Sequence, residues 1–241
     1  MEKRELLYEG KAKRIYATEN SEVVWVEYKD SLTAFNGEKK AEIAGKGVLN
    51  NGITSLLFLK LQEAGIPSHF IKQISETEQL VKRVSIIPLE VVVRNVVAGN
   101  LSKRLGLPEG QPLKQALIEF YYKDDMLGDP LLTEDHIKEL MLASEEEVQI
   151  LKQKALDVNA ILSSFFNEIG VRLIDFKLEF GKFADGEIVL ADEISPDTCR
   201  LWDGKTEEKL DKDVFRRDLG NVVEAYEKIY SKLGGLKACI K

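Results

Sequence analysis

The sequence contains few residues of the kinds that build zinc sites or disulfide frameworks. Among its 241 residues are two cysteines, Cys199 and Cys239, and two histidines, His69 and His136. Two cysteines are too few for the disulfide framework of a small secreted domain, and none of these four residues has the spacing of a metal-ligand motif. We therefore expect neither a zinc site nor a reaction that depends on a cysteine–histidine pair.

Long apolar runs and an excess of positive charge are also missing. The first residues, MEKRELLYEGK, lack the apolar segment of a secretion signal, and no apolar run in the sequence approaches the ~20 residues that cross a bilayer. Lys and Arg number 34 against 41 Asp and Glu, which gives a net charge of −7. This balance disfavours nucleic acid and anionic membranes as partners. We expect a cytoplasmic protein that acts on small molecules.

The first part of the chain is rich in strand-like patterns. The expected strands occupy residues 5–10, 14–18, 22–28, 69–74, 79–84 and 89–97. Between the third and fourth of these strands, an apolar pattern predicts a helix that Asn50 or Asn51 caps and Gly65 ends. The sequence therefore predicts a lobe built mainly from a sheet.

The second part mixes helices with strands. Ser144 and Glu147 form a capping box ahead of a long helical apolar pattern that ends at Gly170. A last helix is expected to begin at Asp211 or Asp213 and to run without a break to the glycine pair in SKLGG. Helices and strands that do not alternate strictly predict an α+β protein rather than a doubly wound sheet.

Residues 86–88, IIP, are the candidate hinge between two lobes. They would divide the chain into an N-terminal sheet-rich lobe, residues 1–87, and a C-terminal α+β lobe, residues 88–241. A chain of this length is large enough for either one domain or two.

Apolar and charged residues alternate in LIDFKLEFG, residues 173–181. In an extended strand Asp175, Lys177 and Glu179 would share one face and the apolar residues the other. An ordinary half-buried strand with its polar face in water is one interpretation. The hairpin that follows the stretch favours a second interpretation.

Asp185 and Gly186 have the signature of a two-residue hairpin turn. With that turn, Glu179 would lie directly opposite Asp192, and like charges at opposed positions are destabilising. A hard cation such as Mg²⁺, with phosphate oxygens as its other ligands, would relieve the repulsion, and Lys177 could hold a phosphate. The hypothesis is a metal–nucleotide site, and it depends on the register that the turn sets.

Basic residues follow a glycine near the N-terminus, in YEGKAKRIY. A turn that carries Gly10, Lys11 and Lys13 between two strands can cover phosphates, as the glycine-rich loop of kinases does. The motif GxxxxGK[ST] is absent from the sequence, so this is not a P-loop. A basic turn in water is the alternative.

Three more positions suit anionic ligands. Arg94 ends an apolar run ahead of a short helical segment that opens at Ala98-Gly99-Asn100, where N–H groups could bind a phosphate or carboxylate. Arg200 follows the hairpin; it could bind an anionic substrate or brace a nearby aspartate. For Arg94 and Arg200, pairing with a structural carboxylate remains an alternative. Lys123 ends an aromatic run ahead of an acidic stretch, which by itself indicates a solvated loop.

Taken together, these segments resemble the SAICAR synthetase family over essentially the whole chain. The motifs that carry the resemblance are YEGKAK at 8–13, IIPLEVVVRNVVAG at 86–99, KDD at 123–125, GDP at 128–130, LIDFKLEFG at 173–181 and ADEISPDTCRLWD at 191–203. The resemblance implies an ATP-dependent ligase that joins L-aspartate to carboxyaminoimidazole ribonucleotide (CAIR), giving SAICAR, ADP and phosphate. It also implies a two-lobed fold related to ATP-grasp enzymes and protein kinases, ATP between the lobes, and a homodimer or other homo-oligomer.

The resemblance also assigns roles to individual residues. ATP would contact Lys11, Ala12, Lys13 and the backbone around Ile86. Mg²⁺ would be held by Glu179 and Asp192. The catalytic residues would be Lys123, Lys177 and Asp175. CAIR would contact Arg94, Asn100, Arg200 and Asn36.

Two residues depart from the family pattern. Asn100 stands where the family usually has serine, and Asn36 stands where some members have aspartate. Asn100 can still donate a hydrogen bond. The sequence does not decide whether Asp175 orients the nucleotide or accepts a proton. A small-molecule kinase and a nucleotide sensor without catalysis are the rival functions; a kinase would release a stable phosphorylated product, and a sensor would bind ATP without releasing phosphate.

Overall fold

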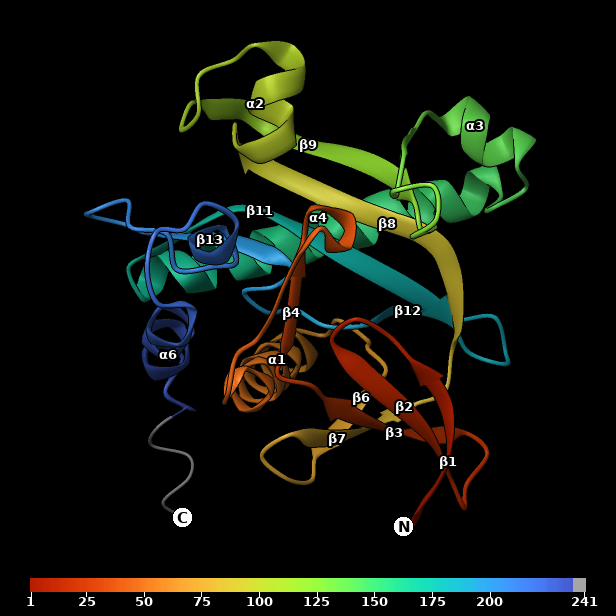
Figure 1. Ribbon diagram of the computed structural model, residues 1–241. Coiled ribbons are helices and arrows are strands. Elements are labelled where there is room, and N and C mark those ends of the chain that lie inside the picture. Colours follow the sequence, from red (N-terminus) through yellow and green to blue (C-terminus); the bar gives the residue numbers. More distant parts are fainter. Residues whose placement is uncertain (236–241) are drawn as a thin grey trace.

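The structure, a computed structural model, describes residues 1–235, so Cys239 lies outside it (Figure 1). The first antiparallel sheet has the strand order β1-β2-β3-β7-β6. Its strands are β1 Lys3–Glu9, β2 Lys13–Thr18, β3 Val23–Tyr28, β7 Glu78–Lys82 and β6 Phe70–Gln73. These bounds confirm five of the six strands expected in the N-terminal part; the sixth, residues 89–97, belongs to the second sheet.

The second antiparallel sheet lies above the first in Figure 1 and has the order β10-β9-β8-β11-β12, with β13 also paired to β11. Its strands are β8 Ser85–Val96, β9 Pro112–Tyr122, β10 Leu131–Leu132, β11 Val171–Lys182, β12 Ile188–Ala191 and β13 Cys199–Asp203. A small hairpin pairs β4 Ser31–Ala34 with β5 Lys39–Glu42 around the 3₁₀ turn η1, Phe35–Gly37. β8 and β11 form the middle of the second sheet.

Helices pack against both sheets, which confirms the α+β class. They are α1 Lys46–Glu63, α2 Gly99–Leu105, α3 Glu134–Glu139, α4 Glu145–Glu168, α5 Asp213–Arg216 and α6 Val222–Lys232. α1 packs on the first sheet and against α6, whereas α4 packs on β8 and β11. Within residues 1–235 none of these helices has the length and apolar character that a membrane crossing requires.

One main hydrophobic core joins the two sheets. It includes Phe58 of α1 and Phe70 of β6 from the first part of the chain, together with Leu151 of α4 and Phe176 of β11 from the second. The candidate hinge at 86–88 lies inside β8, which pairs with β11 at both ends. The backbone therefore passes between the two parts as a continuous strand.

The start of α1 differs from the prediction. The helix begins at Lys46, and Asn50 and Asn51 lie buried within it instead of capping it. A carboxylate distant in sequence supplies the cap, because the Asp30 side chain accepts hydrogen bonds from the N–H groups of Gly45 at 3.2 Å and Gly47 at 2.8 Å. A local capping pattern does not reveal a tertiary cap of this kind.

The prediction of one unbroken last helix is also wrong. α5 and α6 are separate because Asp218 and Gly220 have positive φ angles of 51° and 145°. Asn221 then caps α6 by accepting a hydrogen bond from the N–H of Val223. The capping box at Ser144 does form as predicted, ahead of α4.

The hairpin between β11 and β12 has a different register from the predicted one. Phe183 and Glu187 close a loop of three residues, in which Gly186 has a φ of 91°. A turn followed by a left-handed glycine is typical of three-residue hairpin loops. Glu179 therefore pairs with Ala191, and the predicted direct opposition of Glu179 and Asp192 is wrong.

Candidate active site

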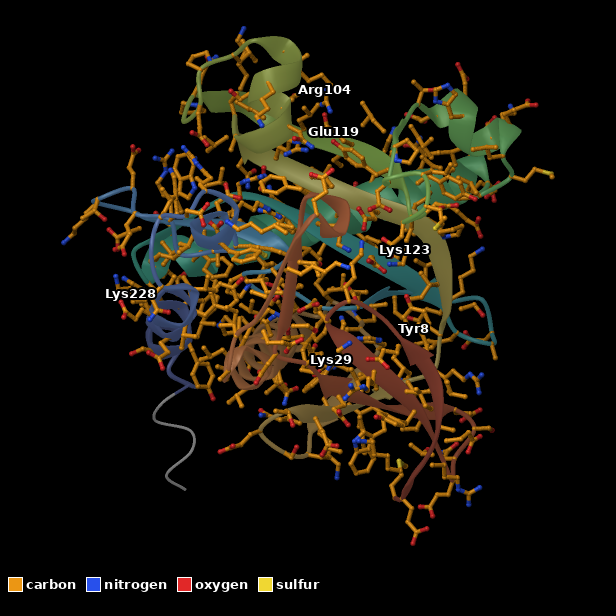
Figure 2. All side chains as sticks on the ribbon, viewed as in Figure 1. Tyr8, Lys29, Arg104, Glu119, Lys123 and Lys228 are labelled. Carbon is orange, nitrogen blue, oxygen red and sulfur yellow. The ribbon has the colours of Figure 1, made fainter. Side chains whose placement is uncertain are left out.

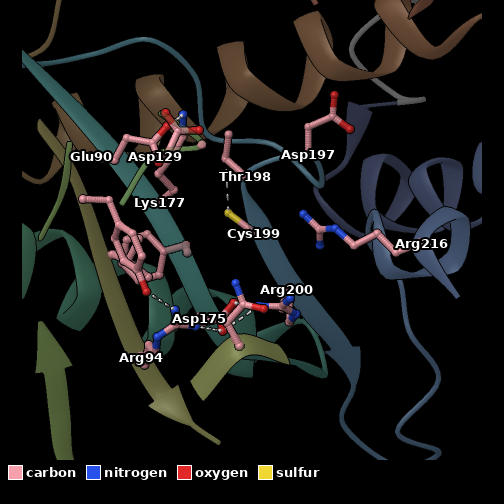
Figure 3. A pocket seen from close by; sticks show the side chains of 15 residues that line it. Glu90, Arg94, Asp129, Asp175, Lys177, Asp197, Thr198, Cys199, Arg200 and Arg216 are labelled. Carbon is pink, nitrogen blue, oxygen red and sulfur yellow. Dashed lines mark hydrogen bonds and ion pairs between the residues drawn. The ribbon is translucent and has the colours of Figure 1, made fainter. Parts of the chain in front are cut away.

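Two adjoining cavities lie along the second sheet. The larger, about 570 Å³, lies between the two sheets and is lined by residues of both. The smaller, about 300 Å³, lies between the second sheet, α2 and α5 (Figure 3). Glu90, Asp129 and Lys177 line both cavities. A ligand in one cavity can therefore meet a ligand in the other at these three residues.

The pairing of β8 with β11 explains why charges of both signs share one face. Glu90 is the Cα partner of Glu179, and Arg94 is the partner of Asp175. Lys177 lies between these pairs on the same face, which lines the cavities. The predicted alternation is confirmed for Phe176, Leu178 and Phe180, which are at most 1% exposed and belong to the main core on the other face. Ile174 differs, because the pairing of β11 with β13 is irregular between Leu173 and Asp175, and Ile174 packs with Val96, Ala98 and Trp202.

Lys177 links three acidic residues at the junction. Its neighbour Lys123, which contacts one of them, is labelled between the two sheets in Figure 2. The Nζ of Lys177 lies 2.9 Å from Oε1 of Glu90, 2.5 Å from Oε1 of Glu179 and 3.9 Å from Oδ2 of Asp192. Burial alone would lower the pKa of Lys177, but attraction from these carboxylates raises it well above its ordinary value. Lys123 adds a second cation, with its Nζ 2.8 Å from Oε1 of Glu179. Lys177 is thus held as a cation where the cavities meet.

Asp192 reaches the junction through an unusual backbone conformation. It lies just beyond β12 and has a φ of 55°, a left-handed conformation that non-glycine residues rarely adopt. Its carboxylate forms an ion pair with Lys13, which also lies 3.1 Å from Glu193. Burial would raise the pKa of Asp192, but Lys13 and Lys177 lower it well below its usual range. The side chain is therefore a carboxylate despite its burial.

Glu179 and Asp192 form a partial donor set for a hard cation. Both contact Lys177, so the two carboxylates meet even though the predicted register is wrong. Residues 1–235 contain no group of three or more His, Cys, Asp or Glu side chains that could hold a metal alone. Two carboxylates suit a cation that arrives with phosphate oxygens as its further ligands.

The predicted phosphate loop lies at the edge of the larger cavity. Lys11, Ala12 and Lys13 line this cavity, as does Ile86 at the start of β8. Lys11 reaches across its opening to Asp125, with 2.7 Å between Nζ and Oδ1. Because both side chains are exposed, this ion pair adds little stability and Lys11 can exchange it for a phosphate.

Part of the lining of the larger cavity is apolar. This apolar slot is formed by Ile15, Val24, Val26 and Val81 from the first sheet. A lining that combines an apolar slot with lysines suits a nucleotide, whose base is flat and whose phosphates are charged. The described geometry thus favours a nucleoside triphosphate in this cavity.

Three arginines line the smaller cavity, and carboxylates hold them in place. Asp175 accepts hydrogen bonds from Arg94 Nη1 at 2.8 Å and from Arg200 Nη1 at 2.9 Å, both on Oδ2 (Figure 3). Arg94 also donates to Glu119 at 2.7 Å, and Arg200 to Asp213 at 2.9 Å. Arg200 therefore pairs with Asp175 and Asp213, not with Asp197 or Asp203, the two aspartates that lie close to it in the sequence. Two fixed guanidinium groups suit a phosphate or carboxylate ligand.

α2 completes the smaller cavity and begins at Gly99, as predicted. Asn100 is exposed and lines the cavity. Gly99 has a φ of 54°, and a Cβ there would lie 2.3 Å from Nη2 of Arg200. Only glycine allows the backbone and Arg200 to approach each other this closely. Asn36 lies in η1, and its side chain lies outside the described residues.

Sequence reasoning missed several residues of the site. Glu90 was detectable, because it is the charged residue that shares a strand face with Arg94 four positions later. Asp129 has a φ of 50° in a loop and lines both cavities. Arg216 enters the smaller cavity from the short helix α5, whose apolar pattern gives no such signal. The structure does bring together the predicted residues Lys123, Lys177, Asp175 and Arg200.

Comparison with known proteins places the chain among enzymes of one kind. The family model described as SAICAR synthetase matches residues 6–233. The phosphoribosylaminoimidazole-succinocarboxamide synthase of Bacillus cereus (strain G9842) is 67% identical, over 98% of this chain and 99% of that protein.

Two solved structures are similar to the whole fold. The crystal structure of phosphoribosylaminoimidazole-succinocarboxamide synthase from Ehrlichia chaffeensis has a TM-score of 0.94 and 50% identity, and covers 96% of this chain and 99% of its own. A SAICAR synthetase (Type-2) in complex with ADP has a TM-score of 0.93 and 49% identity, and covers 96% and 98%. The chain therefore belongs to the SAICAR synthetase family.

Proposed function

We propose that the two cavities bring ATP and CAIR together, so that L-aspartate is joined to the CAIR carboxylate with release of ADP and phosphate. The observation that carries this proposal is that Glu90, Asp129 and Lys177 line both cavities. A γ-phosphate in the larger cavity would then meet a carboxylate from the smaller one. The ADP bound in the similar solved structure supports ATP as the nucleotide.

In the larger cavity, Lys11, Ala12, Lys13 and Ile86 would contact ATP. The apolar slot would take the base, and the lysines would neutralise the phosphates. Glu179 and Asp192 would hold Mg²⁺, which when bound with ATP neutralises phosphate charge. Lys123 and Lys177 remain beside the phosphates as fixed cations.

In the smaller cavity, Arg94, Arg200 and Asn100 would bind the nucleotide acceptor, with Asn36 as a further candidate contact. Asp175 would orient it indirectly, because its oxygens already accept hydrogen bonds from the two arginines. A carboxylate occupied in this way is a poor proton acceptor, so we assign it orientation rather than proton transfer.

The reaction would proceed through an acyl phosphate. A carboxylate is a poor electrophile, and transfer of the γ-phosphoryl group to one of its oxygens supplies a good leaving group. The aspartate amine then attacks the carbonyl carbon, and phosphate leaves with that oxygen. Oxygen-18 in the CAIR carboxylate should appear in the released phosphate; unlabelled phosphate would exclude this route.

The deciding experiment measures phosphate release from Mg-ATP and CAIR with and without L-aspartate, together with SAICAR formation. We expect release that depends on aspartate and equals product mole for mole. A phosphorylated product without aspartate would instead indicate a kinase, and nucleotide binding without release would indicate a sensor.

The substitution Gly99→Ala tests the acceptor site. The added Cβ would displace Arg200, whose other contacts to Asp175 and Asp213 resist movement, so we expect KM for CAIR to rise about tenfold to a hundredfold. Gly106→Ala is the matched control, since Gly106 also has a positive φ of 65° but no atom lies within 4 Å of the position that its added Cβ would take. Equal KM values in the two variants would contradict the role of the close approach.

We also propose that the protein works in the cytoplasm as a homodimer or other homo-oligomer. The net charge of −7 supports small-molecule partners over nucleic acid or membranes.

The proposed lobes are residues 1–87, which contribute most ATP contacts, and 88–241, which contain the acceptor cavity. Sedimentation equilibrium would give the number of subunits, and a single subunit at working concentration would contradict the oligomer.

A further inference from the structure

Asp211 is a buried carboxylate that touches neither cavity. Its side chain is 0% exposed. Oδ2 accepts a hydrogen bond from the N–H of Leu201 at 2.8 Å, and Oδ1 accepts one from the N–H of Asp213 at 2.7 Å. One carboxylate therefore ties the backbone of β13 to the start of α5.

Both tied segments carry arginines of the smaller cavity. Arg200 directly precedes Leu201 in β13, and Arg216 is the last residue of α5. Between them the Asp213 carboxylate accepts hydrogen bonds from Arg200 Nε at 2.9 Å and Arg216 Nη1 at 2.5 Å. Figure 3 shows both arginines beside the cavity. The position of Asp213 thus sets the directions of two cationic side chains.

We propose that Asp211 is a positioning residue for the nucleotide acceptor, acting through Asp213 on Arg200 and Arg216. This inference rests on the proposed function, because it requires that the arginines bind CAIR. Without the tie, the start of α5 could move relative to β13, and the two guanidinium groups would lose their common anchor.

The electrostatics support a role beyond holding the fold. Burial and the neighbouring Asp213 raise the pKa of Asp211 to about 7. The folded state therefore disfavours the charged form of this side chain, and ionised Asp211 reduces stability at neutral and higher pH. The benefit of the carboxylate lies in having two acceptor oxygens for two backbone donors.

The substitution Asp211→Asn separates these effects. An amide has the same size but one acceptor oxygen, so either Leu201 or Asp213 loses its hydrogen bond. We expect the Kd and KM for CAIR to rise about tenfold, the effect of one buried hydrogen bond left unmade. The affinity for ADP, measured in the other cavity by calorimetry, should stay within twofold of the parent, as should kcat at saturating CAIR.

Asp203→Asn is the matched control, because Asp203 ends the same strand and caps an exposed turn. Its Oδ1 accepts hydrogen bonds from the N–H groups of Lys205 and Thr206, both at 3.0 Å. An asparagine retains that oxygen, so CAIR binding should be unchanged. Thermal unfolding of both variants would show that each is folded at the assay temperature.

The outcomes distinguish this inference from the proposed function. If the parent protein fails to bind CAIR, the proposed function is wrong and the inference falls with it. If the parent binds CAIR and folded Asp211→Asn binds it within twofold, the positioning role alone is overturned. If Asp211→Asn does not fold, Asp211→Ser replaces it in the same comparison. A serine hydroxyl can still accept a hydrogen bond from the N–H of Asp213.

Discussion

Lys177→Met is expected to lower kcat about a thousandfold, the size of effect seen when one fixed group that stabilises transition-state charge is removed. Lys177 lines both cavities, and its ammonium group contacts Glu90 and Glu179 at their junction. In the Lys177→Met variant, the negative charge on the phosphoryl group during its transfer would no longer be stabilised by this ammonium group. Rapid-quench measurement of ADP formation at saturating ATP, CAIR and L-aspartate would report the step directly.

The control for Lys177→Met is Lys182→Met on the same strand. Lys182 pairs with Glu147 away from both cavities, so its loss should leave kcat within about twofold, as expected for a partly exposed ion pair. Lys123 still contacts Glu179 in the Lys177 variant, which keeps that buried carboxylate paired. A folded Lys177→Met protein with more than a tenth of the parental kcat would contradict the role assigned to Lys177.

Glu179→Gln and Asp192→Asn are each expected to raise the Mg²⁺ concentration for half-maximal turnover by about tenfold to a hundredfold. Each change removes one anionic ligand while keeping the size of the side chain. In these variants Lys177 keeps Glu90 and Lys13 keeps Glu193 as carboxylate partners, so turnover should fall far more than thermal stability. A magnesium titration at fixed, saturating ATP would measure the shift.

Asp185→Asn provides the matched control within the same hairpin. Asp185 accepts a hydrogen bond from the N–H of Glu187 in the exposed loop, far along the strands from Lys177. Its magnesium dependence should equal that of the parent. If either Glu179→Gln or Asp192→Asn kept near-parental turnover at limiting Mg²⁺, those residues would not hold the metal.

Patterns within one element predicted this structure better than patterns that depend on distant contacts. The alternation in residues 173–181 places Asp175, Lys177 and Glu179 on one face because strand geometry has a fixed period of two. The register of the following hairpin failed because a three-residue loop and a two-residue loop share the same Asp-Gly signal. A difference of one residue was enough to change the partner of Glu179.

The remaining differences have tertiary causes. α1 starts early because Asp30, sixteen positions before Lys46 in the sequence, supplies its cap. Arg216 joins the site through the placement of α5, which local spacing does not reveal. Glu90 differs, because its strand face is shared with Arg94 and follows from the period of two. Glu179 and Asp192 both contact Lys177 despite the wrong register, and Asp192 does so from a left-handed position just beyond β12.

The pairing of β8 with β11 fixes the distance between the two ends of the proposed site. Glu90 and Glu179 mark one end and Arg94 and Asp175 the other, four residues along each strand, or about 13 Å at 3.3 Å per residue. Hydrogen bonds between the strands fix this interval whatever the two lobes do. In the proposed mechanism, an acceptor whose carboxylate and anchored group are spaced differently would miss the phosphate, so we expect the strand pair to select substrates by length.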